Sequence, residues 1–352
     1  MSLVIDGLHK RFGDVVALDG IAFTVEPGEV FGFLGANGAG KTTTMRIVLG
    51  ILEPDAGSVT WHGRPTADLP RRTWGYLPEE RGLYSRMTVL DQLVYFAGLY
   101  GVDRKSAKRE VHAWLERFRV PEFADRRAEQ LSKGNQQKVQ FIAAILHDPD
   151  VLIMDEPFTG LDPVNAALLK EAFLEMRDRG KTLIFSTHQM DLVEELAESI
   201  AIVDRGRVVV GGRMAEIKRA SGRRMVRIAV AGDEDPAWLR ELPGTTVIRS
   251  GVDYTELELD EAGDAEAILT VARAHGPVTR FELADPSVEA IFIEHVGRRP
   301  DEDERHLAAP PPGGGSPADP GPTRVSATDA TARAAAVEPT LPTGRAAMES
   351  DR

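Results

Sequence analysis

Short apolar runs bounded by Gly, Pro and Asp turns recur through the first part of the chain and predict β-strands. The predicted strands cover residues 3–8, 22–25, 29–34, 59–62, 74–77, 151–155 and 182–186. Segments in which apolar residues recur every three or four positions lie between them and predict helices. These segments cover residues 43–52, an insert at 88–129 and a helix after Ser132. We therefore expect an α/β domain with a mixed sheet core, an antiparallel β cover and a helical insert.

The pattern changes after residue 220 and predicts a smaller second domain. Strands are predicted at residues 225–231, 245–249, 254–259 and 278–283, and helices at 236–242, 264–275 and 287–296. This order is that of a ferredoxin-like α+β domain. From residue 298 on there is no Phe, Trp, Tyr or Ile, so we expect a disordered Pro/Ala/Gly-rich tail. The predicted parts are residues 1–220, with a helical subdomain at about 86–147, then 221–297 and 298–352.

Composition and charge narrow the class of protein. The chain has 352 residues, 42% of them hydrophobic, which is enough for two domains with cores of their own. It has no cysteine, no apolar run of about 18 residues and no signal-peptide pattern at its start, so we expect a cytoplasmic protein. The net charge is −13, most of it after residue 220. Because nucleic-acid binders show a basic footprint, no nucleic-acid partner is expected.

The segment between the predicted strand at 29–34 and the helix after it fits the phosphate-binding pattern G-x-x-x-x-G-K-[ST]. Its residues, with the one that follows, are Gly35, Ala36, Asn37, Gly38, Ala39, Gly40, Lys41, Thr42 and Thr43. The glycines let backbone N–H groups point at phosphate oxygens, Lys41 reaches the β and γ phosphates, and Thr42 offers a hydroxyl to Mg²⁺. The sequence therefore predicts a site for a nucleoside triphosphate.

Polar side chains at two later strand ends add candidate chemistry. Asp155 and Glu156 end the apolar strand at 151–155, where the first carboxylate can hold Mg²⁺ and the second can orient or deprotonate an attacking water. Two adjacent acids can also simply be solvated. His188 follows the strand at 182–186 and should lie at the same sheet edge, although most lone histidines are structural.

Two further features have a functional and an ordinary interpretation. Phe12, in a turn before the phosphate loop, can stack on an adenine base or can pack in the core. Ser132 is a good helix N-cap, so the helix start there can bind an anion or can be an ordinary cap.

The order of these motifs resembles that of the nucleotide-binding subunit of an ATP-binding-cassette (ABC) transporter over residues 1 to about 220. The resemblance implies ATP and Mg²⁺ as cofactors, Glu156 and His188 as catalytic residues, and Asp162 as the residue of a conserved loop. It also implies a signature segment formed by Leu131, Ser132, Lys133, Gly134, Asn135 and Gln136. Two such subunits, identical or paired with a related one, would meet head to tail. Each ATP would then lie between the phosphate loop of one chain and the signature of the other.

Three positions depart from the commonest pattern of that family. The signature has Lys133-Gly134-Asn135 where Gly-Gly-Gln is usual, and Glu79 stands where a Gln is usual. Lys133 adds positive charge near phosphates, whereas Glu79 adds a carboxylate that can coordinate Mg²⁺ and repels the γ-phosphate. The segment 75–84 and the end of the second domain resemble the branch that pairs with separate ABC-2 type membrane permeases, generally exporters.

Two functions follow as expectations. In the first, the protein is the ATPase subunit of an exporter, attached to the inner face of the cell membrane through a permease. In the second, it is a soluble cassette ATPase acting in DNA repair or translation. The chain has one cassette, no sustained heptads and no basic patch, which favours the first.

Overall fold

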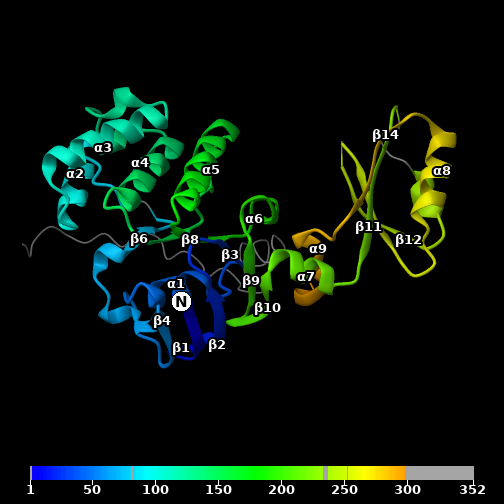
Figure 1. Cartoon of the computed structure of the whole chain (residues 1–352), viewed down its shortest axis with the longest axis horizontal. Coiled ribbons are helices and arrows are strands. Elements are labelled where there is room, and N and C mark those ends of the chain that lie inside the picture. The colour runs from blue at the N-terminus through cyan, green and yellow to red at the C-terminus, as the bar shows by residue number, and fades with distance from the viewer. Residues whose placement is uncertain (1, 81, 233–236, 252, 298–352) are drawn as a thin grey trace, which may run out of the picture. The chain divides into compact units, whose positions relative to one another are not determined.

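The structure, a computed structural model, describes residues 2–80, 82–232, 237–251 and 253–297 (Figure 1). The predicted tail at 298–352 lies outside these residues. Within them, no helix is both long enough and apolar enough to cross a membrane.

The first strands form the predicted antiparallel cover. Its strand order is β2-β1-β4-β5, with β1 (Leu3–Phe12), β2 (Val15–Val25), β4 (Ala56–Trp61) and β5 (Arg64–Pro65). Leu3 lies opposite both Val25 and Trp61, which sets the register of the central strand. Both β1 and β2 are longer than predicted because a tight hairpin at Gly13–Asp14 joins them directly.

The core sheet is mixed, as predicted, with the order β10-β9-β3-β8-β7-β6. Its strands are β3 (Val30–Leu34), β6 (Trp74–Leu77), β7 (Val151–Asp155), β8 (Thr182–Thr187), β9 (Ser199–Asp204) and β10 (Arg207–Arg213). All neighbours are parallel except β9 and β10. Strands β3, β7 and β8 are buried along their whole length, which explains why they read as continuous apolar runs. Their carboxyl ends therefore meet at one sheet edge.

Helices cover this sheet and form the insert. They are α1 (Lys41–Val48), α2 (Val89–Leu99), α3 (Arg104–Arg117), α4 (Lys133–Ile145), α5 (Pro163–Asp178), α6 (Met190–Leu196) and α7 (Met214–Ala220). Short 3-10 turns are η1 (Thr66–Asp68), η2 (Arg71–Thr73), η3 (Pro121–Phe123) and η4 (Ala128–Gln130). Helices α2, α3 and α4 lie together in Figure 1 and share one apolar cluster with the core sheet.

The second domain has the strand order β12-β13-β11-β14, all antiparallel, which is the ferredoxin-like order that the sequence predicts. Its elements are β11 (Arg224–Val230), η5 (Ala237–Glu241), β12 (Thr245–Ser250), β13 (Thr255–Leu259), α8 (Ala265–His275) and β14 (Val278–Ala284). A 3-10 turn, η5, stands where the first helix of that order is expected. Helix α8 and η5 share a small apolar cluster with the sheet.

The last helix, α9 (Val288–Val296), has an unexpected partner. Its Val288, Ile291 and Phe292 are fully buried in the same apolar cluster as the core sheet and α6, rather than in the cluster of the small sheet. The Glu194 carboxylate of α6 accepts a hydrogen bond from the Val288 backbone N–H at 3.3 Å. Helix α9 thus attaches the second domain to α6, the helix that follows His188, through apolar packing and this hydrogen bond.

Candidate nucleotide-binding and catalytic site

The phosphate-loop pattern lies between the buried strand β3 and helix α1. Two of its glycines are required by close contacts. A Cβ atom on Gly35 would lie 2.5 Å from the carbonyl oxygen of Val203, and one on Gly40 would lie 2.7 Å from a methyl group of Leu18. Gly40 also has φ of 108°, in the left-handed region that side chains disfavour. The loop therefore holds its shape only with glycine at these positions.

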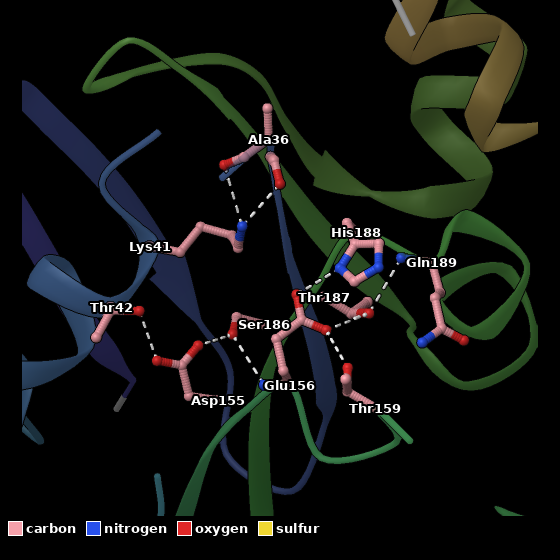
Figure 2. A network of polar contacts seen from close by, with 11 residues as sticks. Ala36, Lys41, Thr42, Asp155, Glu156, Thr159, Ser186, Thr187, His188 and Gln189 are labelled. Carbon is pink, nitrogen blue, oxygen red and sulfur yellow. Dashed lines mark hydrogen bonds and ion pairs between the residues drawn. The ribbon is translucent and has the colours of Figure 1, made fainter. Parts of the chain in front are cut away.

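Lys41 is the first residue of α1, two positions before the predicted helix start. Its ammonium donates hydrogen bonds to the carbonyl oxygens of Gly35 at 2.7 Å and Ala36 at 3.2 Å (Figure 2). Burial lowers the pKa of Lys41, and the negative charges of Glu156, Asp155 and Glu79 act in the opposite direction. The lysine thus lies inside the loop, in the field of the acids at the sheet edge.

Thr42 and Asp155 are brought together from opposite ends of the sequence. The Thr42 hydroxyl donates to one carboxylate oxygen of Asp155 at 2.6 Å, and the Ser186 hydroxyl donates to the other (Figure 2). Asp155 is almost fully buried at the end of β7. A hydroxyl and a carboxylate are the hard oxygen ligands that Mg²⁺ takes, so this pair fits the metal that the motifs imply.

Glu156 is held at the same edge in a strained turn. Its φ is +49°, which is uncommon for a residue other than glycine. Its backbone N–H donates to the Ser186 carbonyl at 3.1 Å. One carboxylate oxygen lies 2.9 Å from Nδ1 of His188, while the other accepts hydrogen bonds from Thr159 at 3.0 Å and Thr187 at 3.2 Å (Figure 2).

The balance of these interactions keeps Glu156 ionised. Burial would raise the pKa of the carboxyl, but the hydrogen bond and charge of His188, with the charge of Lys41, outweigh it. The pKa of Glu156 is therefore lowered below its ordinary value. A buried carboxylate that stays charged and hydrogen-bonded can accept a proton or orient a water molecule.

Glu79 lies in the loop after β6, with its side chain exposed. Partial burial raises the pKa of its carboxyl, and the negative charges of Asp155 and Glu156 raise it further. The field of the strand-end acids thus reaches this loop, as its place in the sequence suggests. A role for Glu79 as a Mg²⁺ ligand remains a proposal.

The signature segment lies at the start of α4. Ser132 caps this helix by accepting a hydrogen bond from the Asn135 N–H at 3.4 Å, and Ser132 and Lys133 are exposed whereas Leu131 and Gly134 are buried. Gln136 is taken up inside the chain, donating to the carbonyls of Ala128 and Leu131. Among the described residues, no hydrogen bond joins residues 131–136 to the phosphate loop.

Asp162 and Phe12 lie at the edges of this arrangement. Asp162 caps α5, and the backbone hydrogen bond from Asn165 lowers the pKa of its carboxyl. Phe12 ends β1 with its ring half exposed and with the Lys10 ammonium 5.8 Å from the ring centre. A half-exposed ring is not a core residue, so the structure does not support core packing as the role of Phe12. Stacking on adenine stays a prediction.

Three polar residues of the network do not figure in the sequence prediction: Ser186, Thr187 and Thr159. The first two end the apolar strand β8, beside Asp155 in the register of β7 and β8. The same argument that singles out His188, namely polar side chains at a strand end, applies to them. Thr159 has no comparable signal, because only the turn after Glu156 brings its hydroxyl back to the carboxylate.

Comparisons with known proteins identify the family. A sequence profile described as ABC transporter matches residues 18–159, and one described as the C-terminal domain of DrrA1-3-like ATP-binding proteins matches residues 212–296. The uncharacterized ABC transporter ATP-binding protein YhaQ of Bacillus subtilis is 45% identical over 295 residues, which cover 84% of this chain and 98% of the relative. The chain belongs to the ABC transporter ATP-binding proteins.

This ABC ATP-binding subunit has further relatives along most of its length. A Nod factor export ATP-binding protein I from Rhizobium sp. is 32% identical over 300 residues, covering 83% of this chain and 96% of the relative. A solved structure described as the ATP binding subunit of an ABC transporter is 33% identical, with a TM-score of 0.59, and covers 63% of this chain and 94% of that one. The match supports the predicted fold.

Proposed function

We propose that this ABC ATP-binding subunit hydrolyses ATP and thereby drives a separate membrane permease, in the direction of export. The observation that carries the proposal is the hydrogen-bonded network that joins Thr42, Asp155 and Ser186 to Glu156 and His188. In this network the loop that ends at Thr42, the Thr42–Asp155 pair and the Glu156 carboxylate lie at one sheet edge, which supports the proposal.

The residues divide the chemistry among them. Lys41 and the backbone of the phosphate loop bind the β and γ phosphates, since the ammonium and the N–H groups oppose their negative charge. Glu156 accepts the proton of the attacking water or orients it, and His188 holds this carboxylate in place. Thr42 and Asp155 would hold Mg²⁺, which when bound would neutralise charge on the phosphate oxygens. Glu79, whose carboxyl lies in the field of the same acids, would be a further oxygen ligand for that ion.

The signature segment supports a second chain as partner. Ser132 and Lys133 are exposed at a helix start and have no bond to the phosphate loop among the described residues. A helix N-terminus with an added lysine suits phosphate oxygens, so we propose that it binds the ATP held by a second ABC subunit.

A groove beside Glu79 supports the membrane partner. A cavity of about 220 Å³ is lined by Tyr76, Pro78, Leu83, Phe96, Leu99 and Tyr100, together with residues of α4. Large apolar side chains around it are exposed, among them Tyr84, Tyr95 and Leu99. Exposed aromatic and aliphatic groups around a cavity are typical of a protein–protein contact. We propose that a cytoplasmic segment of the permease occupies it, which attaches the subunit to the inner face of the membrane.

The relatives favour export over the soluble alternative. A relative that covers most of this chain is named as a Nod factor export ATP-binding protein, and the second domain matches the DrrA1-3-like profile. No observation on this chain favours a role in DNA repair or translation.

The test compares two exposed leucines. Leu99 at the groove is 64% exposed, and Leu283 of the small sheet is 70% exposed. We expect Leu99→Glu to keep the basal ATPase rate but to abolish stimulation by a co-expressed membrane permease, whereas Leu283→Glu keeps both. Wild-type stimulation in Leu99→Glu would show that the permease does not bind in the groove. Absence of any ATP hydrolysis in the wild-type protein would contradict the proposed function itself.

A further inference from the structure

Helix α4 carries the signature segment at its start and contacts the catalytic turn four residues later. Gln137 is 5% exposed, and its side-chain amide donates a hydrogen bond to the carbonyl oxygen of Pro157 at 3.0 Å. Pro157 directly follows Glu156. One side chain thus joins the helix that presents the signature to the turn that presents the base.

The other hydrogen bonds of this turn come from nearer by. Ser186, Thr187 and His188 reach Glu156 from the end of β8, and Thr159 reaches it from within the turn. Among the described residues, Gln137 supplies the side-chain bond to the turn that comes from the helical insert. The turn needs such support, because Glu156 adopts φ of +49°, a conformation that persists only when its surroundings hold it.

The geometry of α4 allows movement at the signature to reach Glu156. Gln137 lies four positions after Lys133, so about 6 Å of helix separates them along the axis. A helix start that shifts carries its own second turn with it, because intrahelical hydrogen bonds make the segment rigid. Helix α4 also packs closely against α5 at Gly134, where a Cβ atom would lie 3.3 Å from the side-chain amide of Asn165.

We infer that Gln137 is a positioning residue that couples the signature of this chain to its own catalytic base. It holds the Pro157 carbonyl, and through it the Glu156 carboxylate, against His188 when α4 lies in the observed place. The inference rests on the proposed function, in which the signature binds the ATP of a second chain. Binding of that ATP then sets the position of Glu156 in this chain, so the two hydrolysis events are coupled.

The test replaces Gln137 with an apolar side chain of similar size that cannot donate. We expect Gln137→Leu to lower kcat for ATP by about tenfold to a hundredfold, with KM for ATP unchanged, since small misplacement of a catalytic group has effects of this size. The Hill coefficient for ATP should fall toward one. Gln92→Leu is the matched control, because Gln92 is also buried and its side-chain amide donates to the backbone carbonyl of Thr88, the N-cap of α2, at 3.4 Å.

A Gln137→Leu protein with wild-type kcat, or with lowered kcat but a wild-type Hill coefficient, would overturn the inference. If Gln137→Leu does not fold, Gln137→Met provides the same comparison with a more flexible side chain. Failure of the proposed function looks different, because the wild-type protein itself would then show no ATP hydrolysis.

Discussion

Glu156 owes its charge to His188 more than to any other neighbour. The carboxyl is buried at the sheet edge, where desolvation opposes ionisation, and the hydrogen bond and charge of His188 reverse that effect. Two hydroxyls, those of Thr159 and Thr187, hold the second carboxylate oxygen. Thr159, Thr187 and His188 therefore orient the Glu156 carboxylate, and His188 contributes most to keeping it ionised.

A pH profile tests this balance. In His188→Ala, burial still raises the pKa of Glu156 while its main opposing interaction is gone, so the pKa should rise. We expect the acid limb of kcat/KM to move toward neutral pH in the variant, whose maximal rate should also fall by roughly 10²–10⁴, the range of general acid–base effects. An acid limb at the wild-type pH would show that His188 does not set the ionisation of Glu156.

At the level of residues, the motifs and their spacing predicted the candidate site because the sequence of each motif determines its local backbone conformation. The glycines of the phosphate loop, Asp155 and Glu156 are recognisable from their strand and helix neighbours alone. The bonding roles of Ser186 and Gln137 could not be recognised in the same way, although the resemblance to the family draws attention to residues 131–137. Their roles depend on contacts with Asp155 and Pro157, which lie 31 and 20 residues away in the sequence.

The loop after β6 is the element that joins the ATP site to the groove. Glu79 follows Pro78, which lines the groove, and its carboxyl lies in the field of Asp155 and Glu156. This loop therefore lines the groove through Pro78 and lies, through Glu79, in the electric field of the candidate ATP site.

Mutation of Glu79 tests that coupling. We expect Glu79→Ala to leave the ATP affinity of the isolated subunit largely intact but to lower permease-stimulated hydrolysis relative to basal hydrolysis, since the lost interaction belongs to the partner-bound state. The adjacent Glu80→Ala is the control, because that acid is equally exposed and its backbone carbonyl, which accepts from Gln140, is retained. An equal stimulation ratio in both variants would leave Glu79 as an ordinary loop residue.

Helix α9 shows what the pattern of apolar positions leaves open. Its periodicity predicted a helix close to its observed bounds, but periodicity does not state which core an apolar face joins. Val288, Ile291 and Phe292 join the core of the ABC domain through α6. Strands β9 and β10 and helices α5, α6 and α7 were not among the predicted elements.

The packing of α9 gives a stability prediction. Phe292 is fully buried, so Phe292→Ala should lower the free energy of unfolding of the ABC domain by about 3–5 kcal/mol. Ile293→Ala, on the neighbouring side of the helix beside a polar hollow, should cost less. Denaturant unfolding monitored through the loss of ATP binding would measure the free energy of unfolding of both variants. Equal midpoints for the two variants would contradict a contribution of α9 to that core.

On the scale of the whole molecule, the sequence predicted the fold class and the ferredoxin-like strand order because each strand and helix carries a distinct period. The tail at 298–352 lies outside the described residues, and its disorder stays a prediction from composition. The arrangement of two chains around ATP depends on contacts between copies, which one sequence does not display. The resemblance to the family implies that arrangement, and the exposure of Ser132 and Lys133 at the start of α4 is consistent with it.

The most direct test of Glu156 as the catalytic base is to measure ATP binding, ATP hydrolysis and dimer formation in Glu156→Gln. The amide keeps the size of the carboxylate and its contact with His188 but cannot accept the proton of the attacking water. We predict wild-type ATP affinity, hydrolysis slowed by about 10²–10⁴, and a dimer on size-exclusion chromatography in Mg²⁺ and ATP. Hydrolysis at the wild-type rate, or a protein that stays monomeric with ATP bound, would contradict the account.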